Sequence, residues 1–493
     1  MESITFITEP LLCPEFVQFD NVIEVLTRLA KKYEVSVASP SLSERVRRDL
    51  DSRGIRPFDG GRSFIRPRHR RDEIPSYAIS WAQDSIFGSN GRTMRKLLDG
   101  RSDFVVNVSM TTAYPSDIWF VQSPGLGLEP MSQGVDGWLS LAFTLGRRPV
   151  ELIDSHHLNR CAQLSSRIYS TTHWVGDYYR QRGMPIRGVL PNYYHSDLSP
   201  STASPSRSYL LGYLGKETDS TALKMIMESG LPLKLFGSKS PGFVRKLTSR
   251  RLPANVEVLG RLSWTELREL YSNASFTVFP FTDEPFGLVP LESMACGTPV
   301  LTYGTQGPGE TVLNGTSGWL VSSPEELVEQ AGRLFEGGYP AWMTAASVER
   351  AKRFSIDRIA GTWEDLLQAA LNGEDDPPTV EPLGLGLRGQ SYTLPPASRS
   401  PVVGAREVAP TLTVDWLGNV PRSGLETNGS FSVVPEPGIP SPADLLRAEQ
   451  PTDGPNGPPR QGSRPNRPFN SVDSPHQARS EAVNHEVGAE RGP

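Results

Sequence analysis

The chain has 493 residues, 37% of them hydrophobic and 21% charged, with a formal net charge of −5. This length predicts two or three domains, and the charge excludes a strongly basic, nucleic-acid-binding class. Three widely separated cysteines exclude a disulfide framework or zinc knuckle, and no apolar run reaches the roughly 18 residues of a membrane span. Because no signal-peptide pattern is present, we expect a cytoplasmic protein.

The first half of the chain predicts a parallel sheet covered by helices. Asn21 and Glu24 form a capping-box pattern at the start of an amphipathic helix, residues 21–33, that lies between two apolar runs. Strands are predicted at residues 3–9, 34–40, 103–110, 117–124 and 166–172. Alternation of strands with helices is typical of a parallel sheet.

A polar break at residues 200–208 separates this half from a second run of strands and helices. Ser263 and Glu266 form another capping-box pattern, at the start of a helix over 264–274. Strands are predicted at residues 209–215, 232–238, 256–260, 275–281 and 299–303. Two such runs predict an α/β fold of two doubly wound, Rossmann-like domains that face a cleft, with ligands beyond the carboxyl ends of the strands.

The composition changes after Asn372. Residues 373–493 contain 20 of the 44 prolines of the chain. A segment this poor in apolar residues cannot bury enough surface to offset its ordering entropy. We therefore expect a disordered, Pro/Gly-rich C-terminal tail whose role the sequence does not indicate.

The segment FTDEPFGLVPLESMACGTPVL, residues 281–301, predicts a helix that starts near Phe286 and Gly287, just after a buried strand. Backbone N–H groups at that start would suit a phosphate, and Gly287 would allow its close approach. Glu292 would accept hydrogen bonds from vicinal hydroxyls such as those of a ribose, and Glu284 would reach a second polyol. Hydroxyls, diphosphate and hydroxyls in this order are the layout of a sugar nucleotide.

This segment resembles the E-x7-E motif of the retaining GT-B glycosyltransferases of glycosyltransferase family 4, the group 1 type. Other segments resemble stretches of that family in the same order, at residues 166–198, 256–281, 307–321 and 354–367. The resemblance covers about residues 1–372. It is strong from Ile168 onward and weak before it.

The resemblance implies the GT-B fold, with an acceptor-side domain at residues 1–195, a nucleotide-sugar-binding domain at 196–355 and a closing helix at 356–372. The implied enzyme is a hexosyltransferase of polysaccharide biosynthesis. It would move a sugar from a nucleotide-diphospho-sugar to a glycan or lipid-linked acceptor, with retention of the anomeric configuration. No cofactor or metal is implied, because a diphosphate is a good leaving group. Asp49 and Asp51 match a metal-binding D-x-D only in their letters, since they lie in a charged, helix-like run.

By this resemblance, Glu292 binds the ribose hydroxyls and Glu284 contacts the transferred sugar. The backbone N–H groups of Phe286, Gly287 and Leu288 would lie near the diphosphate. One short segment would therefore hold every part of the donor except its base.

The resemblance assigns the rest of the donor to two other loops. Val258 and Gly260 would flank the base, and Gly309 and Glu310 would lie near the sugar and phosphates. A plain turn is the alternative interpretation of the second loop.

The sequence departs from the family pattern at the phosphates and at the acceptor. Tyr213 stands near the usual position of a phosphate-binding Arg, and Lys216 is the nearby cation that we assign to the diphosphate and, with Glu284, to catalysis. A surface lysine is the alternative for Lys216. Gln122 stands where many members have a His, so it would hydrogen-bond a sugar without acting as a base. The acceptor site is therefore not assigned.

A basic run, Arg62–Arg71, is a local charge feature of the first domain. Together with Phe64 and Ile65 it would contact anionic headgroups, as a peripheral protein does at the inner face of a membrane. A solvated surface loop is the alternative interpretation.

Two other functions stay open at this point. One is a sugar-nucleotide epimerase or phosphorylase on the same architecture, against which the E-x7-E context argues. The other is a catalytically silent binding or scaffold protein, which Tyr213, Gln122 and the tail motivate. The sequence does not indicate the sugar, the base, the acceptor or the oligomeric state.

Overall fold

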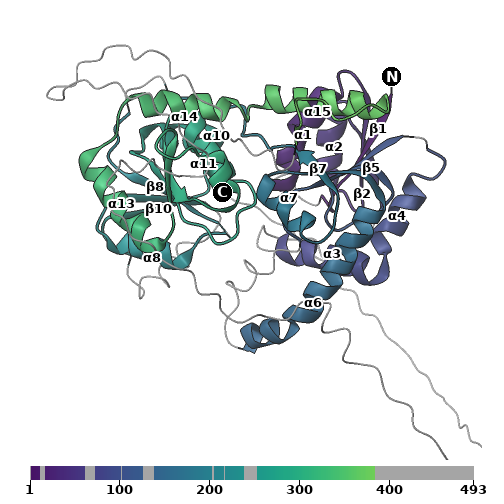
Figure 1. Ribbon diagram of the computed structural model, residues 1–493, viewed down its shortest axis with the longest axis horizontal. Coiled ribbons are helices and arrows are strands. Elements are labelled where there is room, and N and C mark those ends of the chain that lie inside the picture. Colours follow the sequence, from purple (N-terminus) through teal and green to yellow (C-terminus); the bar gives the residue numbers. More distant parts are fainter. Residues whose placement is uncertain are drawn as a thin grey trace, which may run out of the picture. The chain divides into compact units, whose positions relative to one another are not determined.

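The computed structural model describes residues 2–11, 17–61, 73–101, 103–125, 138–201, 205–215, 217–237 and 252–382 (Figure 1). Within these ranges the chain forms two α/β sheets with their covering helices. Three predictions fall outside the described residues: the role of Lys216, the basic run at Arg62–Arg71, and the tail beyond residue 382.

The first sheet has the order β14-β7-β6-β5-β4-β1-β2-β3 among the described residues. Its strands are β1 (Ser3–Ile7), β2 (Glu34–Ser39), β3 (Arg56–Asp59), β4 (Phe104–Asn107), β5 (Ser116–Val121), β6 (Ser165–Ser170), β7 (Ile186–Val189) and β14 (Glu381–Pro382). The pairs are parallel except β14 with β7. Ile4, Phe6 and Ile7 of β1 are fully buried, as expected of a strand that helices cover on both faces.

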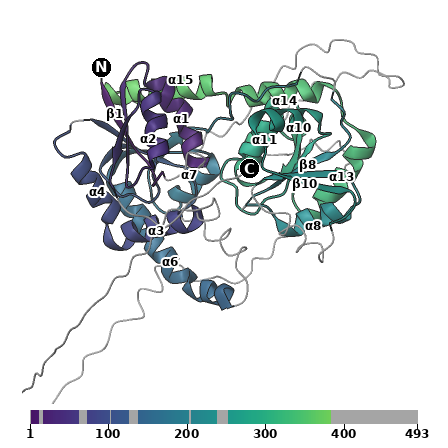
Figure 2. The same ribbon diagram turned by 180° about the vertical axis from the view of Figure 1, so that it is seen from behind.

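Helices from before and after the second domain cover the first sheet. They are α1 (Val17–Leu29), α2 (Glu44–Ser52), α3 (Glu73–Phe87), α4 (Ser89–Leu97), α6 (Trp138–Gln163), α7 (His173–Arg180) and α15 (Ile356–Leu371). α15 runs alongside α1 in both views (Figures 1 and 2). Its Trp363 packs edge-on against Phe120 of β5, with ring centroids 5.4 Å apart, so the helix after the second domain completes the first core.

The second sheet has the order β10-β9-β8-β11-β12-β13, with every described pair parallel. Its strands are β8 (Leu210–Leu214), β9 (Leu233–Gly237), β10 (Val256–Gly260), β11 (Thr277–Phe279), β12 (Val300–Tyr303) and β13 (Gly318–Val321). Its helices are α8 (Ser220–Glu228), α10 (Trp264–Asn273), α11 (Leu288–Ala295), α12 (Gln306–Thr311), α13 (Pro324–Gly337) and α14 (Trp342–Lys352). Strand order reverses between β8 and β11, and the crevice at such a point is where doubly wound sheets bind ligands.

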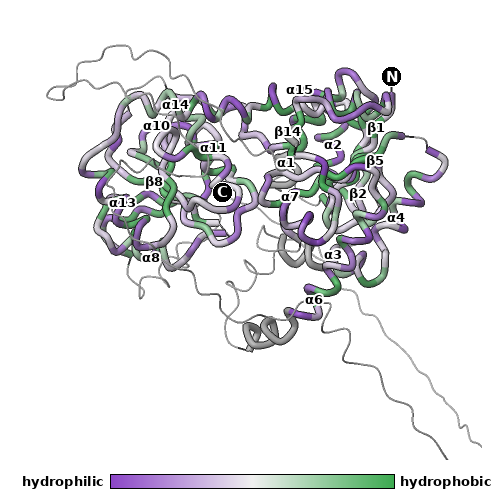
Figure 3. The backbone as a smooth tube through the Cα atoms, in the orientation of Figure 1, coloured by the Kyte–Doolittle hydropathy of each residue, from purple (hydrophilic) through white to green (hydrophobic). Residues whose placement is uncertain are grey.

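Burial explains why these segments form strands. In Figure 3 the strands inside each sheet, such as β5 and β8, are coloured as hydrophobic. Leu210, Leu211 and Leu214 of β8 are fully buried in the second core. No helix among the described residues is long and apolar enough to cross a membrane.

The two predicted doubly wound domains are confirmed, and the capping prediction holds at one of two helices. The Ser263 hydroxyl accepts the N–H of Glu266, and a Glu266 carboxylate oxygen accepts the N–H of Ser263 at 2.8 Å, which is the predicted capping box. The prediction at Asn21 is wrong. The helix there already begins at Val17, so Asn21 lies within it and cannot cap its start.

Residues 373–382, which the composition placed in the tail, pack against the first sheet. The Tyr169 hydroxyl donates to the Asp376 carboxylate at 2.5 Å, and the Arg187 guanidinium lies 3.0 Å from the same group. Val380 is buried, and β14 follows it. Composition misses this segment because polar contacts and a two-residue strand, rather than an apolar run, hold it in place.

Candidate functional site

The candidate site lies at the carboxyl edge of the second sheet, where the β8 and β11 loops meet. The N–H of Thr282 donates to the Glu217 carbonyl at 2.8 Å, and the N–H of Asp219 donates to the Pro280 carbonyl at 3.2 Å. Thr218 and Phe281 form an antiparallel bridge between the same loops. These bonds join the two loops at the point where strand order reverses.

α11 begins beside these loops with two N–H groups that already bind a carboxylate oxygen. Gly287 is the residue before the helix and has φ 95°, a left-handed value that suits glycine. One oxygen of the Glu284 carboxylate accepts the N–H of Gly287 at 2.9 Å and that of Phe286 at 3.2 Å. Leu288 opens the helix and packs against the second core. The predicted phosphate position is thus occupied by the chain's own carboxylate.

α12 fixes the backbone of this loop. The Gln306 side chain accepts the N–H of Glu284 at 2.7 Å and donates to the Thr282 carbonyl at 3.3 Å. Gln306 has φ 54°, which is uncommon for a residue with a side chain. A Cβ on Gly307 would lie 2.3 Å from the nitrogen of Phe286, so only glycine fits there. Sequence reasoning missed Gln306, because nothing in its letters predicts a positive φ.

Glu292 lies within α11 and is hydrogen-bonded to a buried tyrosine. The Tyr271 hydroxyl, from α10, donates to the Glu292 carboxylate at 2.8 Å. Burial raises the pKa of Glu292 to about 7, although the Tyr271 hydrogen bond acts to lower it. A carboxyl group with this pKa changes charge close to neutral pH.

Glu310 contacts the start of α7 from the first domain. Its two carboxylate oxygens accept the N–H groups of His173 at 2.9 Å and Trp174 at 2.7 Å, which are donors that a helix start leaves without a partner inside the helix. The buried Arg350 donates to the carbonyls of Glu310 at 2.6 Å and Thr311 at 2.8 Å. The carboxylate predicted to lie near the sugar and phosphates therefore caps a helix.

The remaining predicted residues of the second domain occupy separate places along this edge. Gly309 packs against the end of β12, since a Cβ there would lie 2.9 Å from the Gly304 backbone. Val258 and Gly260 belong to β10, the edge strand, and Gly260 has φ 74° beside a shift in the strand register. Tyr213 packs its ring 5.3 Å from that of Phe236.

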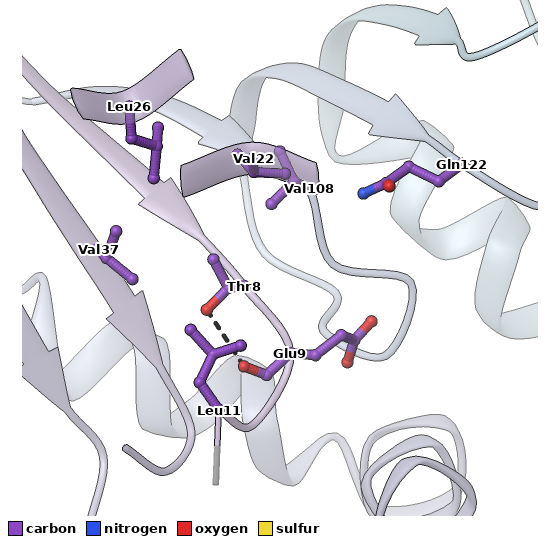
Figure 4. Close-up of a pocket in the computed structure, with 8 residues that line it drawn as sticks. All are labelled: Thr8, Glu9, Leu11, Val22, Leu26, Val37, Val108 and Gln122. Carbon is purple, nitrogen blue, oxygen red and sulfur yellow. Dashed lines mark hydrogen bonds between the residues drawn. The ribbon is translucent and has the colours of Figure 1, made fainter. Parts of the chain in front are cut away.

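Gln122 lies at the carboxyl end of β5, beside a small cavity of about 20 Å³, which is room for about one water molecule (Figure 4). The residues that line it are Thr8, Glu9, Leu11, Val22, Leu26, Val37, Val108 and Gln122. Gln122 therefore belongs to the first domain and lies beside this cavity.

Glu9 is a buried acid of this cavity that sequence reasoning missed. It follows β1 at the reversal point of the first sheet, and its carboxylate accepts the N–H groups of Met110 at 2.6 Å and Thr111 at 3.1 Å, and the Thr111 hydroxyl. Burial raises the pKa of Glu9 to about 7 against these bonds. The segment TEP, directly after the first strand, could have indicated this residue. It places an acid at the carboxyl edge of a buried sheet, where acids are rare.

No group of three His, Cys, Asp or Glu side chains within the described residues is placed to hold a metal ion. Asp49 lies on α2, as predicted, and its carboxylate pairs with the guanidinium of Arg53 at 3.0 Å. His157 of α6 is buried, with its Nε2 at 3.1 Å from the Met110 carbonyl, and burial lowers its pKa.

Comparison with known proteins identifies the region that holds the candidate site. Residues 221–353 match the family model of the group 1 glycosyl transferases. This region includes Glu284, Glu292 and Glu310, so the predicted E-x7-E segment lies inside a group 1 glycosyl transferase match.

Two curated relatives agree with this match. The D-inositol 3-phosphate glycosyltransferase of Acidothermus cellulolyticus is 38% identical over 107 residues, which are 20% of this chain and 24% of that protein. The protein of the same name from Mycobacterium bovis is 33% identical over 141 residues, 27% of this chain and 28% of that protein. The chain thus spans about a quarter of the length of the curated relatives it matches.

Solved structures show the same fold over a longer part of the chain. Sucrose-phosphate synthase from Thermosynechococcus elongatus has a TM-score of 0.56 at 16% identity, covering 76% of this chain and 100% of that one. HepE of Anabaena, solved in complex with UDP, has a TM-score of 0.51 at 14% identity, covering 75% of this chain and 100% of that one. These neighbours and the two sheets confirm the predicted GT-B fold of two Rossmann-like domains.

Proposed function

We propose that the chain is a glycosyltransferase that moves a sugar from a nucleotide-diphospho-sugar to a glycan or lipid-linked acceptor, with retention of the anomeric configuration. The observation that carries the proposal is the position of the E-x7-E segment. It places Glu284 before α11 and Glu292 inside it, at the reversal point of a Rossmann-like sheet and within the group 1 glycosyl transferase match.

Donor binding begins with the diphosphate at the start of α11. The N–H groups of Phe286 and Gly287 now bind the Glu284 carboxylate, so a diphosphate oxygen takes over these donors. The displaced Glu284 carboxylate turns to the hydroxyls of the sugar. Glu292 receives the ribose hydroxyls, and the end of β10 at Val258 and Gly260 flanks the base.

Transfer breaks the bond between the sugar and the diphosphate and forms a bond to an acceptor hydroxyl on the same face. The hydroxyl proton passes to the departing diphosphate oxygen. The backbone N–H groups stabilise the negative charge of the leaving group, with Lys216 as the added cation. No metal or cofactor takes part. The proposal includes transfer of a hexosyl group, a role in polysaccharide biosynthesis and an acceptor contact at Gln122. It also includes a cytoplasmic location, with membrane contact through Arg62–Arg71.

The curated relatives and the solved neighbours indicate which donors to test first. The curated relatives are named as glycosyltransferases, and HepE was solved with UDP, so UDP-sugars head a panel that includes GDP-, ADP- and TDP-sugars. The full chain is incubated with each donor, with and without sugar and lipid-linked acceptors, and with a chelator in parallel.

We expect one donor class to release its nucleoside diphosphate and to give a product with the anomeric configuration of the donor. Activity persists with the chelator and falls at least about 100-fold in Glu292→Ala, because a hydrogen-bonded, desolvated contact is lost. Isomerised sugar nucleotide without an acceptor would instead identify an epimerase. Nucleotide binding without any turnover would identify a silent scaffold.

A further inference from the structure

Tyr271 is a fully buried residue that no predicted role accounts for. It lies on α10, and its ring packs edge-on to that of Phe236, with centroids 5.5 Å apart and planes at 80°. Its backbone carbonyl accepts the Thr298 hydroxyl at 2.7 Å. Packing on the ring and this backbone bond fix the side chain, so the position of its hydroxyl is set by the core.

The Tyr271 hydroxyl donates its hydrogen bond to the Glu292 carboxylate, at 2.8 Å. A carboxylate has about four acceptor positions on its two oxygens. One of these receives the tyrosine, which leaves enough for two hydroxyls of a vicinal diol. A buried donor at one oxygen also fixes the plane of the carboxylate, on which the geometry of a two-hydroxyl contact depends.

We propose that Tyr271 is a positioning residue for the donor nucleotide, whose hydroxyl holds the Glu292 carboxylate in the orientation that receives both hydroxyls of the ribose. This inference rests on the proposed function. It adds that the preference for a ribonucleotide over a 2′-deoxyribonucleotide depends on the Tyr271–Glu292 pair rather than on Glu292 alone.

The Tyr271–Glu292 hydrogen bond can be tested through the pH dependence of nucleotide binding, because it affects the pKa of Glu292. Burial raises its pKa to about 7, and the Tyr271 bond lowers it. Cys296, the residue directly after α11, has its own pKa raised to about 12 by burial and then by Glu292, so it stays neutral. Tyr213 lies near Tyr271, and Arg268 and Glu269 of α10 lie near Cys296. Arg350 of α14, the helix that packs on α11, donates to the carbonyls of Glu310 and Thr311 instead.

The direction of the pH effect follows from this arrangement. Ribose hydroxyls donate to the ionised carboxylate, so ribonucleotide affinity is highest above the pKa of Glu292 and falls as the pH drops through about 7. Tyr271→Phe removes a bond that lowers this pKa, so the midpoint moves to higher pH. A role confined to core packing would not move the midpoint.

The experiment measures the dissociation constants of UDP, GDP and ADP for the full chain, and then compares the tightest one with its 2′-deoxy analogue from pH 5.5 to 8.5. We expect the wild type to prefer the ribonucleotide by about tenfold at pH 8, and less at pH 6. Tyr271→Phe weakens the ribonucleotide about threefold to fivefold at pH 7, leaves the deoxy analogue within about twofold, and shifts the midpoint upward. In the Glu292→Gln background it has no further effect.

Tyr339→Phe is the matched control. Its hydroxyl donates to the Ser275 carbonyl at 2.7 Å in the same domain, so this variant loses a similar hydrogen bond away from Glu292. We expect it to bind both nucleotides like the wild type.

The outcomes separate the inference from the proposed function. If the ribose preference of the wild type is lost in Glu292→Gln but unchanged in Tyr271→Phe, the inference is wrong and the proposed function stands. If Tyr271→Phe weakens the ribonucleotide and the deoxy analogue equally, its role is structural and the inference is wrong. If the wild type binds none of the three nucleotides, the inference is wrong, and the proposed function is wrong as well if TDP also fails to bind. The wild-type pH profile alone contradicts the inference if the ribose preference does not fall below pH 7.

Discussion

Glu9, Glu284 and Glu310 each accept two backbone N–H groups of a loop or a helix start. Glu9 joins the loops after β1 and β4, Glu284 binds the start of α11, and Glu310 binds the start of α7. Each carboxylate accepts two N–H groups, an arrangement that suits an anion. The acids are visible in the sequence, but their partners are not.

The partners of Glu284 separate nucleotide binding from transfer. Glu284→Ala frees the N–H groups of Phe286 and Gly287, so we expect a plain nucleoside diphosphate to bind as tightly as in the wild type or up to about tenfold tighter. Transfer from the sugar nucleotide falls at least about 100-fold, because the contact to the sugar is lost. Calorimetric binding and initial rates on the same preparation measure both, and weaker binding of the diphosphate would contradict the proposed exchange of partners.

Burial of Glu9 predicts a pH dependence of stability. The folded state holds a proton that the unfolded chain has released once the pH exceeds about 4.5, so the free energy of unfolding falls as the pH rises from about 4.5 to 7. Glu9→Gln stays neutral, and we expect it to gain about 3 kcal/mol relative to the wild type between pH 4.5 and pH 8. Urea unfolding over this range measures the difference.

Glu336→Gln, at an exposed position of α13, is the control for that series and should track the wild type at every pH. A wild type that gains stability relative to Glu9→Gln as the pH rises would mean that the N–H bonds of Met110 and Thr111 outweigh burial.

At the scale of elements, close backbone contact between α12 and the β11 loop shapes the candidate site. Gly307 approaches the Pro285–Phe286 peptide, and its N–H donates to the Glu284 carbonyl at 3.1 Å. A motif match indicates a glycine-rich loop but not that a second loop crosses it. The sequence therefore indicates candidate residues for this site but not the contacts between their loops.

Gly307→Ala tests this contact. A Cβ at 2.3 Å from the Phe286 nitrogen forces the two loops apart, so we expect a loss of about 1–3 kcal/mol in stability and weaker nucleotide binding. Gly332→Ala, within α13 and with nothing within 4 Å of the added Cβ, is the matched control and should stabilise by about 0.5–1 kcal/mol. Equal effects of the two substitutions, measured by chemical unfolding, would contradict this packing.

At the scale of the whole molecule, alternation of strands and helices was enough to predict two doubly wound domains. Apolar runs predict buried strands such as β8, and Ser263 with Glu266 predicts a helix start through local hydrogen bonds. The return of α15 to the first sheet and the strand β14 depend on long-range contacts. Local patterns do not encode such contacts, so the composition placed the start of the tail too early, at residue 373.

Residues 373–382 therefore give a prediction about chain length. A chain that ends at Pro382 keeps the Asp376 contacts to Tyr169 and Arg187, whereas one that ends at Asn372 loses them and the buried Val380. We expect the shorter chain to be less stable by about 2–4 kcal/mol, and to melt several degrees lower. Asp376→Asn in the longer chain should reproduce part of the loss, and equal melting temperatures of the two chains would show that this segment contributes nothing.

The most direct test of the central claim is thermal unfolding of the full chain with UDP, GDP, ADP and TDP, each with and without sugars, beside the Glu292→Ala variant. A nucleotide at 100 times its dissociation constant adds about 2.7 kcal/mol, which raises the melting temperature by a few degrees. We predict such a shift with one nucleotide, and its loss in Glu292→Ala. No shift with any of the four in the wild type would contradict a nucleotide-sugar site at α11.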